Sequence, residues 1–170
     1  MRFSLIDRIE RLEPGASITA VKVLSMAEEY LADHFPGFPV MPGVLMLEAM
    51  TQAGAWLVRV TEDFAHSMVV LKEARSVKYG QFVEPGQTLQ VIDEILSQTE
   101  RETILKARGM VDGRTTVSAR LVLERYDLAE TQPSHAPTDE LIKRQMREMF
   151  ALLYPADRQP AKTASHTTTV

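Results

Sequence analysis

The pattern of apolar and polar positions predicts a mostly extended chain with one long buried helix. Residues 43–60 contain no proline and carry apolar side chains on nearly every face, which is typical of a helix that protein surrounds. Partial alternation and β-branched residues predict five strands, at residues 16–25, 68–79, 88–98, 102–111 and 115–125. A strand, a loop, a long helix and then a series of strands indicate an α+β domain, with one antiparallel sheet curled around one helix.

Turn signals separate the predicted elements. Residues 12–15 and 84–86 each contain proline followed by glycine, and Asp112-Gly113 is expected to form a type I′ hairpin turn. Residues 34–43 (HFPGFPVMPG) hold three prolines and two glycines. This density excludes regular structure and predicts a shaped loop immediately before the helix.

The composition changes after residue 126. We expect a domain over residues 1–126, and then a linker and a C-terminal helix over residues 127–154. Within that part, the helix is predicted at 139–153, capped by Thr138. The polar, threonine-rich stretch 155–170 is expected to be a disordered tail.

Composition and charge restrict the function. A chain of 170 residues fits one domain, and the absence of cysteine excludes disulfides, thiolate nucleophiles and zinc–thiolate sites. A net charge of -4 with scattered basic residues argues against a nucleic-acid partner. No apolar run reaches the length of a membrane span and the N-terminus does not resemble a signal peptide, so we expect a cytoplasmic protein.

Two ionisable residues near the loop carry the candidate chemistry. Glu48 lies in the middle of the apolar helix, where an ionised carboxylate is costly unless it finds partners or stays protonated. Gln52 follows one turn later and could orient it. His34 begins the rigid loop, and imidazole is the side chain best suited to accept a proton near neutral pH. At Gly43 the helix begins, and its free N–H groups could polarise a carbonyl.

These groups suit the removal of a proton α to a thioester carbonyl and the protonation of a departing β-hydroxyl. Such a reaction needs neither a metal nor an organic cofactor. A lone histidine and a lone buried glutamate are also commonly structural, so the residues alone leave both interpretations open.

The run HFPGFPVMPGVLMLEAMTQAG, residues 34–54, resembles the signature HFPGxPxMPGVLxxEAxAQ of FabZ-type β-hydroxyacyl-acyl carrier protein dehydratases. The likeness continues into both flanks and covers about residues 3–126. It implies the hot dog fold, in which a curled antiparallel sheet wraps a long central helix. It also implies a substrate carried on acyl carrier protein, an elimination of water that gives a trans-2-enoyl thioester, and a homodimer or a trimer of dimers.

The resemblance also assigns roles to single residues. It implies that His34 is the catalytic base and that Glu48, from the other subunit of a dimer, is the catalytic acid. It implies that the Gly43 N–H polarises the thioester carbonyl and that Gln52 holds Glu48. We further expect Phe38 and Val44 to contact the substrate.

Three positions depart from the family pattern. Asp33 replaces a usual glycine before the histidine, Thr51 replaces a usual alanine beside the acid, and Phe38 stands where a polar residue is common. None of these changes removes a catalytic group. Two other functions stay open: a hot dog acyl thioesterase and a non-catalytic acyl-binding subunit of a synthase.

Other side chains have plain structural interpretations. His66 and His135 are expected to be structural or solvated. Lys72, Arg75 and Lys78 could attract an acidic carrier protein, although solvated strand charges are the commoner explanation. The basic side of the C-terminal helix could dock on a partner or a membrane surface, although packing on its own domain is the favoured interpretation.

Overall fold

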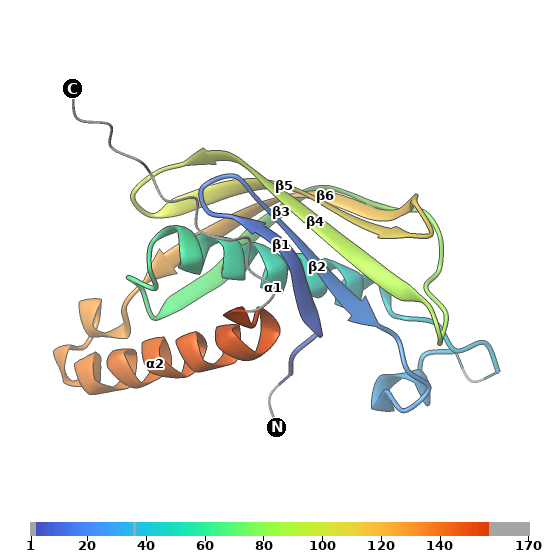
Figure 1. Ribbon diagram of the computed structural model, residues 1–170, viewed down its shortest axis with the longest axis horizontal. Helices are drawn as coiled ribbons and strands as arrows, with labels where there is room; N and C mark the ends of the chain where they lie inside the picture. The colour runs from blue at the N-terminus through green and yellow to red at the C-terminus, as the bar shows by residue number, and fades with distance from the viewer. Residues whose placement is uncertain (1–2, 36, 157–170) are drawn as a thin grey trace.

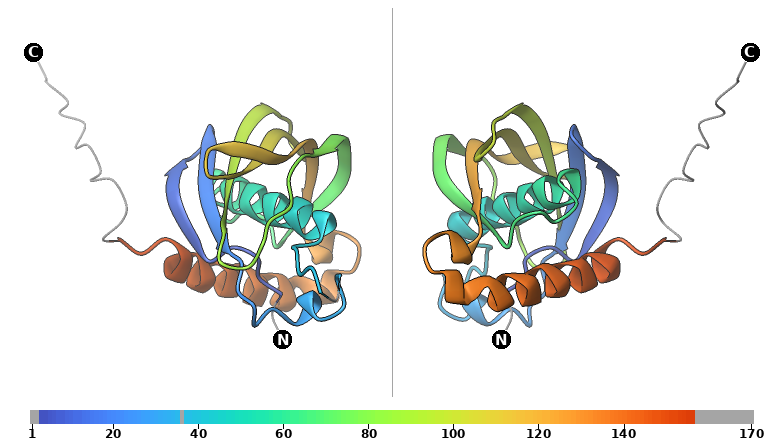
Figure 2. Two further views of the ribbon diagram at one scale, coloured as in Figure 1. Left: turned by 90° about the vertical axis from the view of Figure 1, so that its right-hand side faces the viewer. Right: turned by 90° about the vertical axis from the view of Figure 1, so that its left-hand side faces the viewer.

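A computed structural model describes residues 3–35 and 37–156 of the chain. The long helix α1 (Gly43–Thr61) lies beneath a curled sheet, and a second helix, α2 (Ala136–Leu153), runs beneath α1 (Figure 1). Side views show the sheet curving around α1 while α2 stays outside that curve (Figure 2). The architecture predicted from the pattern, one antiparallel sheet curled around one helix, is therefore confirmed.

Six strands pair antiparallel in the order β1-β2-β4-β5-β6-β3. Their bounds are β1 (Arg8–Glu13), β2 (Ser17–Val23), β3 (Met68–Tyr79), β4 (Thr88–Gln98), β5 (Glu102–Val111) and β6 (Arg114–Tyr126). The five predicted strands are present with small shifts at their ends. Strand β1 was not predicted, because four of its six residues are charged and only Ile9 is fully buried.

The predicted turns join the strands as expected. Gly15 and Gly86 have φ values of +78° and +90°, which glycine adopts without steric cost. Asp112 and Gly113 both have positive φ, 49° and 76°. This pair of values is what a type I′ turn requires between two strands of right-handed twist.

Helix α1 packs closely against the sheet. Ala49, Met50 and Leu57 have no exposed surface. At Gly54, an added Cβ would lie 2.4 Å from the Leu105 side chain, so only glycine allows α1 to approach β5 this closely. The prediction that protein surrounds α1 on every side was wrong on one face, where Val44 is 67% exposed and Glu48 is half-buried.

The C-terminal segment is more regular than the sequence indicated. Two short 3-10 helices, η2 (Leu128–Glu130) and η3 (Pro133–His135), occupy the predicted linker. Helix α2 begins at Ala136 rather than at residue 139, and the predicted cap by Thr138 was wrong because His135 is the N-cap residue. Pro137 explains the earlier start, since proline is favoured in the first turn of a helix.

Most of the predicted disordered tail lies outside the described residues, which end at residue 156. Among the residues that the structure describes, no helix combines the length and the apolar character that crossing a membrane requires.

Candidate active site

His34 lies in the loop before α1 with one of its ring nitrogens engaged. Its Nδ1 is 3.0 Å from the carbonyl oxygen of Val40. A carbonyl can only accept a hydrogen bond, so in the neutral ring Nδ1 carries the proton and Nε2 keeps its lone pair. The neighbouring Phe35 has a φ of 42°, a value that bulky residues rarely adopt. The loop therefore holds the imidazole through one hydrogen bond and one strained backbone position.

A cavity of about 280 Å³ opens beside His34. It is lined by the loop before α1, by the start of α1, and by the end of β3 with the segment that follows it: His34, Phe35, Met41, Gly43, Met46, Tyr79, Gly80, Gln81 and Phe82. The Tyr79 ring packs so closely on Gly43 that a Cβ there would lie 2.9 Å from it. A side chain at the first position of α1 would therefore displace the Tyr79 ring. The backbone N–H at this position has no partner within the helix.

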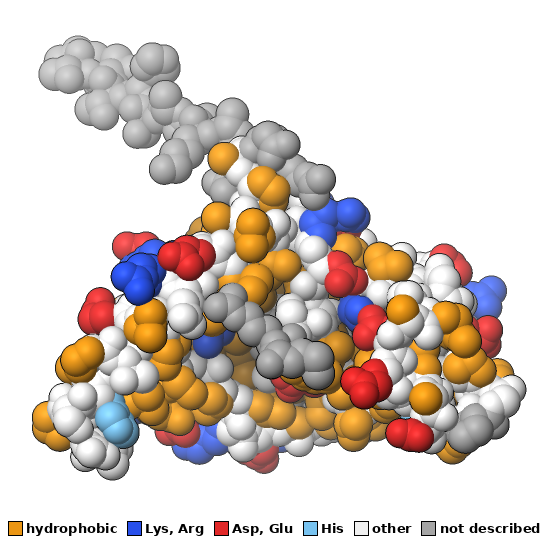
Figure 3. Space-filling model, turned by 90° about the horizontal axis from the view of Figure 1, so that it is seen from below, with side chains coloured by type: hydrophobic (Ala, Val, Ile, Leu, Met, Phe, Trp, Pro, Cys, Tyr) orange, Lys and Arg blue, Asp and Glu red, His pale blue; other side chains and the backbone are white. Residues whose placement is uncertain are grey.

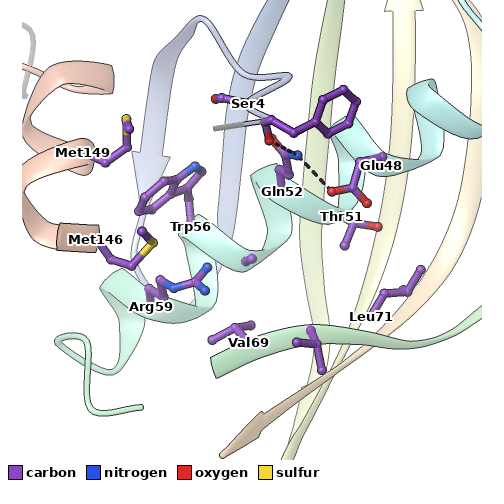
Figure 4. A pocket seen from close by; sticks show the side chains of 13 residues that line it. Ser4, Glu48, Thr51, Gln52, Trp56, Arg59, Val69, Leu71, Met146 and Met149 are labelled. Atoms are coloured by element: carbon purple, nitrogen blue, oxygen red, sulfur yellow. Dashed lines mark hydrogen bonds between the residues drawn. The ribbon is translucent and has the colours of Figure 1, made fainter. Parts of the chain in front are cut away.

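Glu48 lies on the open face of α1, half-buried, and borders a second cavity of about 490 Å³. In this cavity, α1 contributes Glu48, Thr51, Gln52, Ala55, Trp56 and Arg59. The start of β3, the N-terminal residues Phe3 and Ser4, and Met146 and Met149 of α2 complete the lining (Figure 4). The expectation of a buried glutamate holds only in part, because Glu48 is half-buried and the cavity gives its carboxyl group access from one side.

Gln52 orients Glu48, as predicted from their spacing. Its Nε2 donates to Glu48 Oε1 at 2.9 Å and to the Phe3 carbonyl at 3.2 Å. Its Oε1 accepts a hydrogen bond from the Leu5 N–H at 2.8 Å. One amide therefore ties the N-terminal segment to the carboxyl group of Glu48 (Figure 4).

Within one chain, His34 and Glu48 line different cavities that share no residue. The two cavities reach opposite ends of β3, since the Glu48 cavity contacts Val69 to Leu71 and the His34 cavity contacts Tyr79. Within the described residues, strand β3 is an edge of the sheet and pairs with β6 alone. Its other edge has backbone groups available for a further strand.

Exposed apolar side chains border both cavities. Phe35, Phe82 and Tyr79 are 53%, 60% and 51% exposed beside His34, and Phe3 is 58% exposed beside Glu48. In the view from below, hydrophobic side chains lie open between scattered acidic and basic groups (Figure 3). Exposed apolar surface of this kind marks a binding or association surface.

The two other predicted substrate contacts lie on the surface. Val44 is 67% exposed at the start of α1, and Phe38 is 48% exposed with its ring edge-on to Phe82 at 5.6 Å between centroids. Neither lines the two cavities described above. Asp33, the departure before the histidine, is exposed, and Thr51, the departure beside the acid, donates its hydroxyl to the Leu47 carbonyl.

His66 has an acidic neighbour that the sequence did not reveal. Its Nδ1 lies 3.4 Å from Asp127 Oδ2, and Asp127 and Glu130 approach it closely enough for a metal ion to bridge the three. Their carboxylates are already engaged, Asp127 by Lys143 at 3.2 Å and Glu130 by Arg101 at 2.5 Å. The cluster is therefore an ion-pair network that fastens the segment after β6, in agreement with the structural interpretation of His66.

Two of the three strand cations have partners within the chain. Lys72 lies 2.5 Å from Glu102 and 3.7 Å from Glu124, and Arg75 lies 2.5 Å from Glu73. These pairs support the interpretation of Lys72 and Arg75 as solvated strand charges over a role in attracting a carrier protein.

Sequence reasoning missed a second acidic group against α1. Asp93 of β4 is completely buried, and neither carboxyl oxygen has a hydrogen-bond partner of good geometry in the described chain. Burial raises the pKa of Asp93 well above its ordinary value, and the nearby Gly54 backbone N–H opposes this only in part. The signal was present, because Asp93 continues the inward register of Leu89 and Val91 in β4.

Comparison with known families supports a single assignment. A family model described as a FabA-like domain matches residues 1–120. The protein named 3-hydroxyacyl-[acyl-carrier-protein] dehydratase FabZ from Pediococcus pentosaceus is 35% identical over 116 residues, which are 68% of this chain and 78% of the relative. The protein of the same name from Symbiobacterium thermophilum is 35% identical over 132 residues, covering 78% of this chain and 93% of the relative.

Solved structures share the fold at lower identity. The dehydratase heterocomplex ApeI:P from Xenorhabdus doucetiae matches with a TM-score of 0.63 and 18% identity, covering 78% of this chain and 89% of the matched chain. A mutant thioesterase from Pseudomonas aeruginosa matches with a TM-score of 0.56 and 15% identity, covering 69% and 79%. At these identities the likeness shows the fold alone, and it confirms the predicted hot dog fold.

Proposed function

This chain belongs to the FabA-like family, and we propose that it removes water from 3-hydroxyacyl thioesters carried on acyl carrier protein, with His34 as base and Glu48 as acid. Its activity is that of a hydro-lyase of the FabZ type in fatty acid biosynthesis. One observation carries the assignment of the two residues. His34 and Glu48 each have one polar partner that orients them, and each borders a cavity at one end of the same edge strand.

The hydrogen bond of His34 supports its role as the base. Because Nδ1–H donates to the Val40 carbonyl, Nε2 offers its lone pair toward a proton of the substrate. The Cα proton of a 3-hydroxyacyl thioester is acidified by the neighbouring carbonyl. Nε2 takes this proton, and its electron pair forms the new double bond.

Glu48 completes the elimination in its protonated form. Its carboxyl group gives a proton to the β-hydroxyl as the carbon–oxygen bond breaks, and water leaves. The products are a trans-2-enoyl thioester, an imidazolium and a carboxylate. A proton then returns from the imidazolium to the carboxylate, directly or through water, and restores both groups.

The start of α1 is suited to stabilising the charge that develops on the thioester oxygen. Gly43 is the first residue of α1, so its N–H lies at the positive end of the helix and lacks an intrahelical acceptor. A hydrogen bond from this group to the carbonyl strengthens as the carbonyl gains enolate character.

A dimer brings the two cavities together. When two copies pair antiparallel along β3, residues 69–71 of one copy lie beside Tyr79 of the other, because antiparallel pairing reverses one strand relative to its partner. The Glu48 cavity then adjoins the partner's His34 cavity, and a two-fold axis produces the same site twice. The exposed aromatic side chains around both cavities would be covered in this arrangement. A trimer of such dimers remains compatible with it.

We also propose that the protein acts in the cytoplasm on a substrate carried by acyl carrier protein.

The direct test uses the purified protein and 3-hydroxybutyryl-acyl carrier protein. The enoyl product is followed by its ultraviolet absorbance and mass, while a thiol reagent reports thioester hydrolysis. We expect enoyl thioester without free thiol, and we expect His34→Ala to lose the activity by about 100-fold or more. Release of free thiol would support a thioesterase instead, and full activity of His34→Ala would reject the base assignment.

A further inference from the structure

We propose that α2 forms the distal wall of the acyl-chain pocket, and that Met146 and Met149 set the length of acyl chain that the protein accepts. The inference rests on the proposed function for its substrate class. It concerns a part of the chain that the family match does not include, since that match ends at residue 120 and α2 begins at Ala136.

The geometry of the Glu48 cavity carries this inference. The residues that α1 contributes follow one face of the helix from Glu48 to Arg59, a rise of about 16 Å. Glu48 marks the reacting end, and the two methionines lie beside Trp56 and Arg59 at the opposite end (Figure 4). A chain attached at the thioester would extend along this face toward α2.

The chemistry of the lining suits a hydrocarbon chain. Between the two ends, Ala55, Trp56 and Val69 present apolar surface, and the cavity has a volume of about 490 Å³. Methionine is flexible and polarizable, so Met146 and Met149 can pack against chain ends of slightly different shape. The guanidinium of Arg59 lies 5.5 Å from the centroid of the Trp56 ring, and burial lowers its pKa to about 10.

Helix α2 is fixed firmly enough to act as a wall. Asp139 in its first turn is buried and accepts hydrogen bonds from the Ser67 hydroxyl at 2.5 Å and from the Leu128 and Ala129 N–H groups at 2.9 Å. Farther along, Arg147 donates to the Asp63 carbonyl at 2.9 Å. These hydrogen bonds attach α2 to the rest of the domain before and after Met146.

Aromatic packing holds the following turn of α2. The Phe150 ring lies 6.2 Å from Trp56 and 5.9 Å from both Phe64 and Tyr154, measured between centroids. A rigid element that presents two side chains to the end of a pocket restricts the pocket's depth, whereas a loosely attached helix would yield to a longer chain.

The test compares larger and smaller side chains at this wall with a matched change on the outer face of α2. Met146→Phe and Met149→Phe fill the distal end, the double change to Ala enlarges it, and Leu152→Phe adds the same ring at a position that is 76% exposed. For each protein, kcat/KM is measured on 3-hydroxybutyryl and 3-hydroxydodecanoyl thioesters of acyl carrier protein. Thermal unfolding establishes that each variant is folded.

We expect the ratio of long-chain to short-chain kcat/KM to fall about tenfold or more in a Phe variant, mainly through a higher KM for the long chain. The double Ala variant should raise the ratio, and Leu152→Phe should leave it at the wild-type value. The same ratio in wild type, Phe and Ala variants would overturn the inference. If one variant does not fold, the others decide.

A binding measurement separates this inference from the proposed function. Trp56 is the only tryptophan of the chain and lines the pocket, so its fluorescence reports occupancy without catalysis. Titration with the saturated dodecanoyl thioester of pantetheine should change Trp56 emission, with a weaker Kd in the Phe variants. A wild-type protein that dehydrates no thioester but shows this pattern would reject the proposed function and support the wall. Absence of any Trp56 response, or equal Kd values in all variants, would overturn the inference that α2 forms the wall of the pocket.

Discussion

Two carboxyl groups, Glu48 of α1 and Asp93 of the sheet beside it, differ in their access to a cavity and in their hydrogen bonding. Glu48 faces a cavity, is half-buried and receives a hydrogen bond from Gln52. Asp93 faces α1 from the sheet side near Gly54, is fully enclosed and has no hydrogen-bond partner of good geometry in the described chain. Gly54 follows Glu48 by six residues, which places the two contacts about 120° apart around the helix.

The difference shows that burial alone does not identify a catalytic acid. A proton donor must reach the substrate, and Glu48 borders a cavity and accepts a hydrogen bond from the Gln52 amide. Asp93 has the stronger perturbation, since burial raises its pKa well above the ordinary value, yet it borders neither of the two cavities of the proposed site. We therefore expect the accessible group to govern activity and the enclosed group to govern stability.

The largest expected effect is on kcat, which should depend on Glu48 and not on Asp93. Glu48→Gln keeps the size of the side chain and removes the acidic proton, so kcat for dehydration should fall by about 100- to 10,000-fold. Asp93→Asn is the matched change on the other side of α1 and should retain wild-type kcat. Steady-state assays on 3-hydroxybutyryl-acyl carrier protein measure both. An active Glu48→Gln protein would remove the acid from the mechanism.

The second largest expected effect is that Asp93 changes how the free energy of unfolding depends on pH. Because the pKa of Asp93 is higher in the folded than in the unfolded protein, the folded state binds the proton more tightly. The proton on Asp93 therefore stabilises the folded protein at low pH. This stabilisation is lost as the pH rises from the ordinary aspartate pKa to the raised pKa, and the free energy of unfolding falls by up to about 1.4 kcal/mol per pH unit in that range. Asp93→Asn lacks this loss, so it should gain stability relative to wild type as the pH increases.

Urea unfolding of both proteins at several pH values measures this difference. Other titrating groups are common to the two proteins and cancel in the comparison. The two proteins should approach equal pH dependence at the acid end of the range and diverge toward neutral pH. Parallel stability curves across the whole range would mean that Asp93 is not perturbed by burial.

A smaller effect on kcat is expected from Gln52, which donates a hydrogen bond to Glu48. Gln52→Ala removes the hydrogen bond to Glu48 and leaves the Leu5 N–H without its acceptor. One hydrogen bond contributes about 1 kcal/mol, so kcat should fall several-fold with little change in KM. Gln98→Ala, which removes a hydrogen bond from a glutamine to Glu62 away from both cavities, serves as the control. Equal kcat values in Gln52→Ala and the control would deny Gln52 a positioning role.

Much of the fold was predictable because its signals are local. The apolar run after Pro42, the β-branched strands and the Asp112-Gly113 turn each specify their structure within a few residues. Strand β1 was missed because its side chains are mostly charged, and its place depends on pairing with β2. The early start of α2 was missed because Pro137 was taken as linker, although proline is favourable in a first turn.

The site was predictable only in part, because its second half depends on contacts between distant segments. His34, Glu48 and Gln52 lie within one stretch whose pattern carries the chemistry. Met146 and Met149 reach the Glu48 cavity only through the packing of α2, and no local pattern in the sequence indicates this. The contact between His66 and Asp127 likewise joins residues on either side of four strands.

The central claim, that each active site takes His34 from one subunit and Glu48 from the other, is tested most directly by mixing two inactive proteins. His34→Ala and Glu48→Gln subunits are unfolded together in equal amounts and refolded. Every mixed dimer then contains one site with both native residues and one site with neither. With random pairing in a two-fold dimer, we predict recovery of about a quarter of wild-type activity. A mixture that forms mixed dimers, verified by mass spectrometry, and stays as inactive as its components would contradict the shared site.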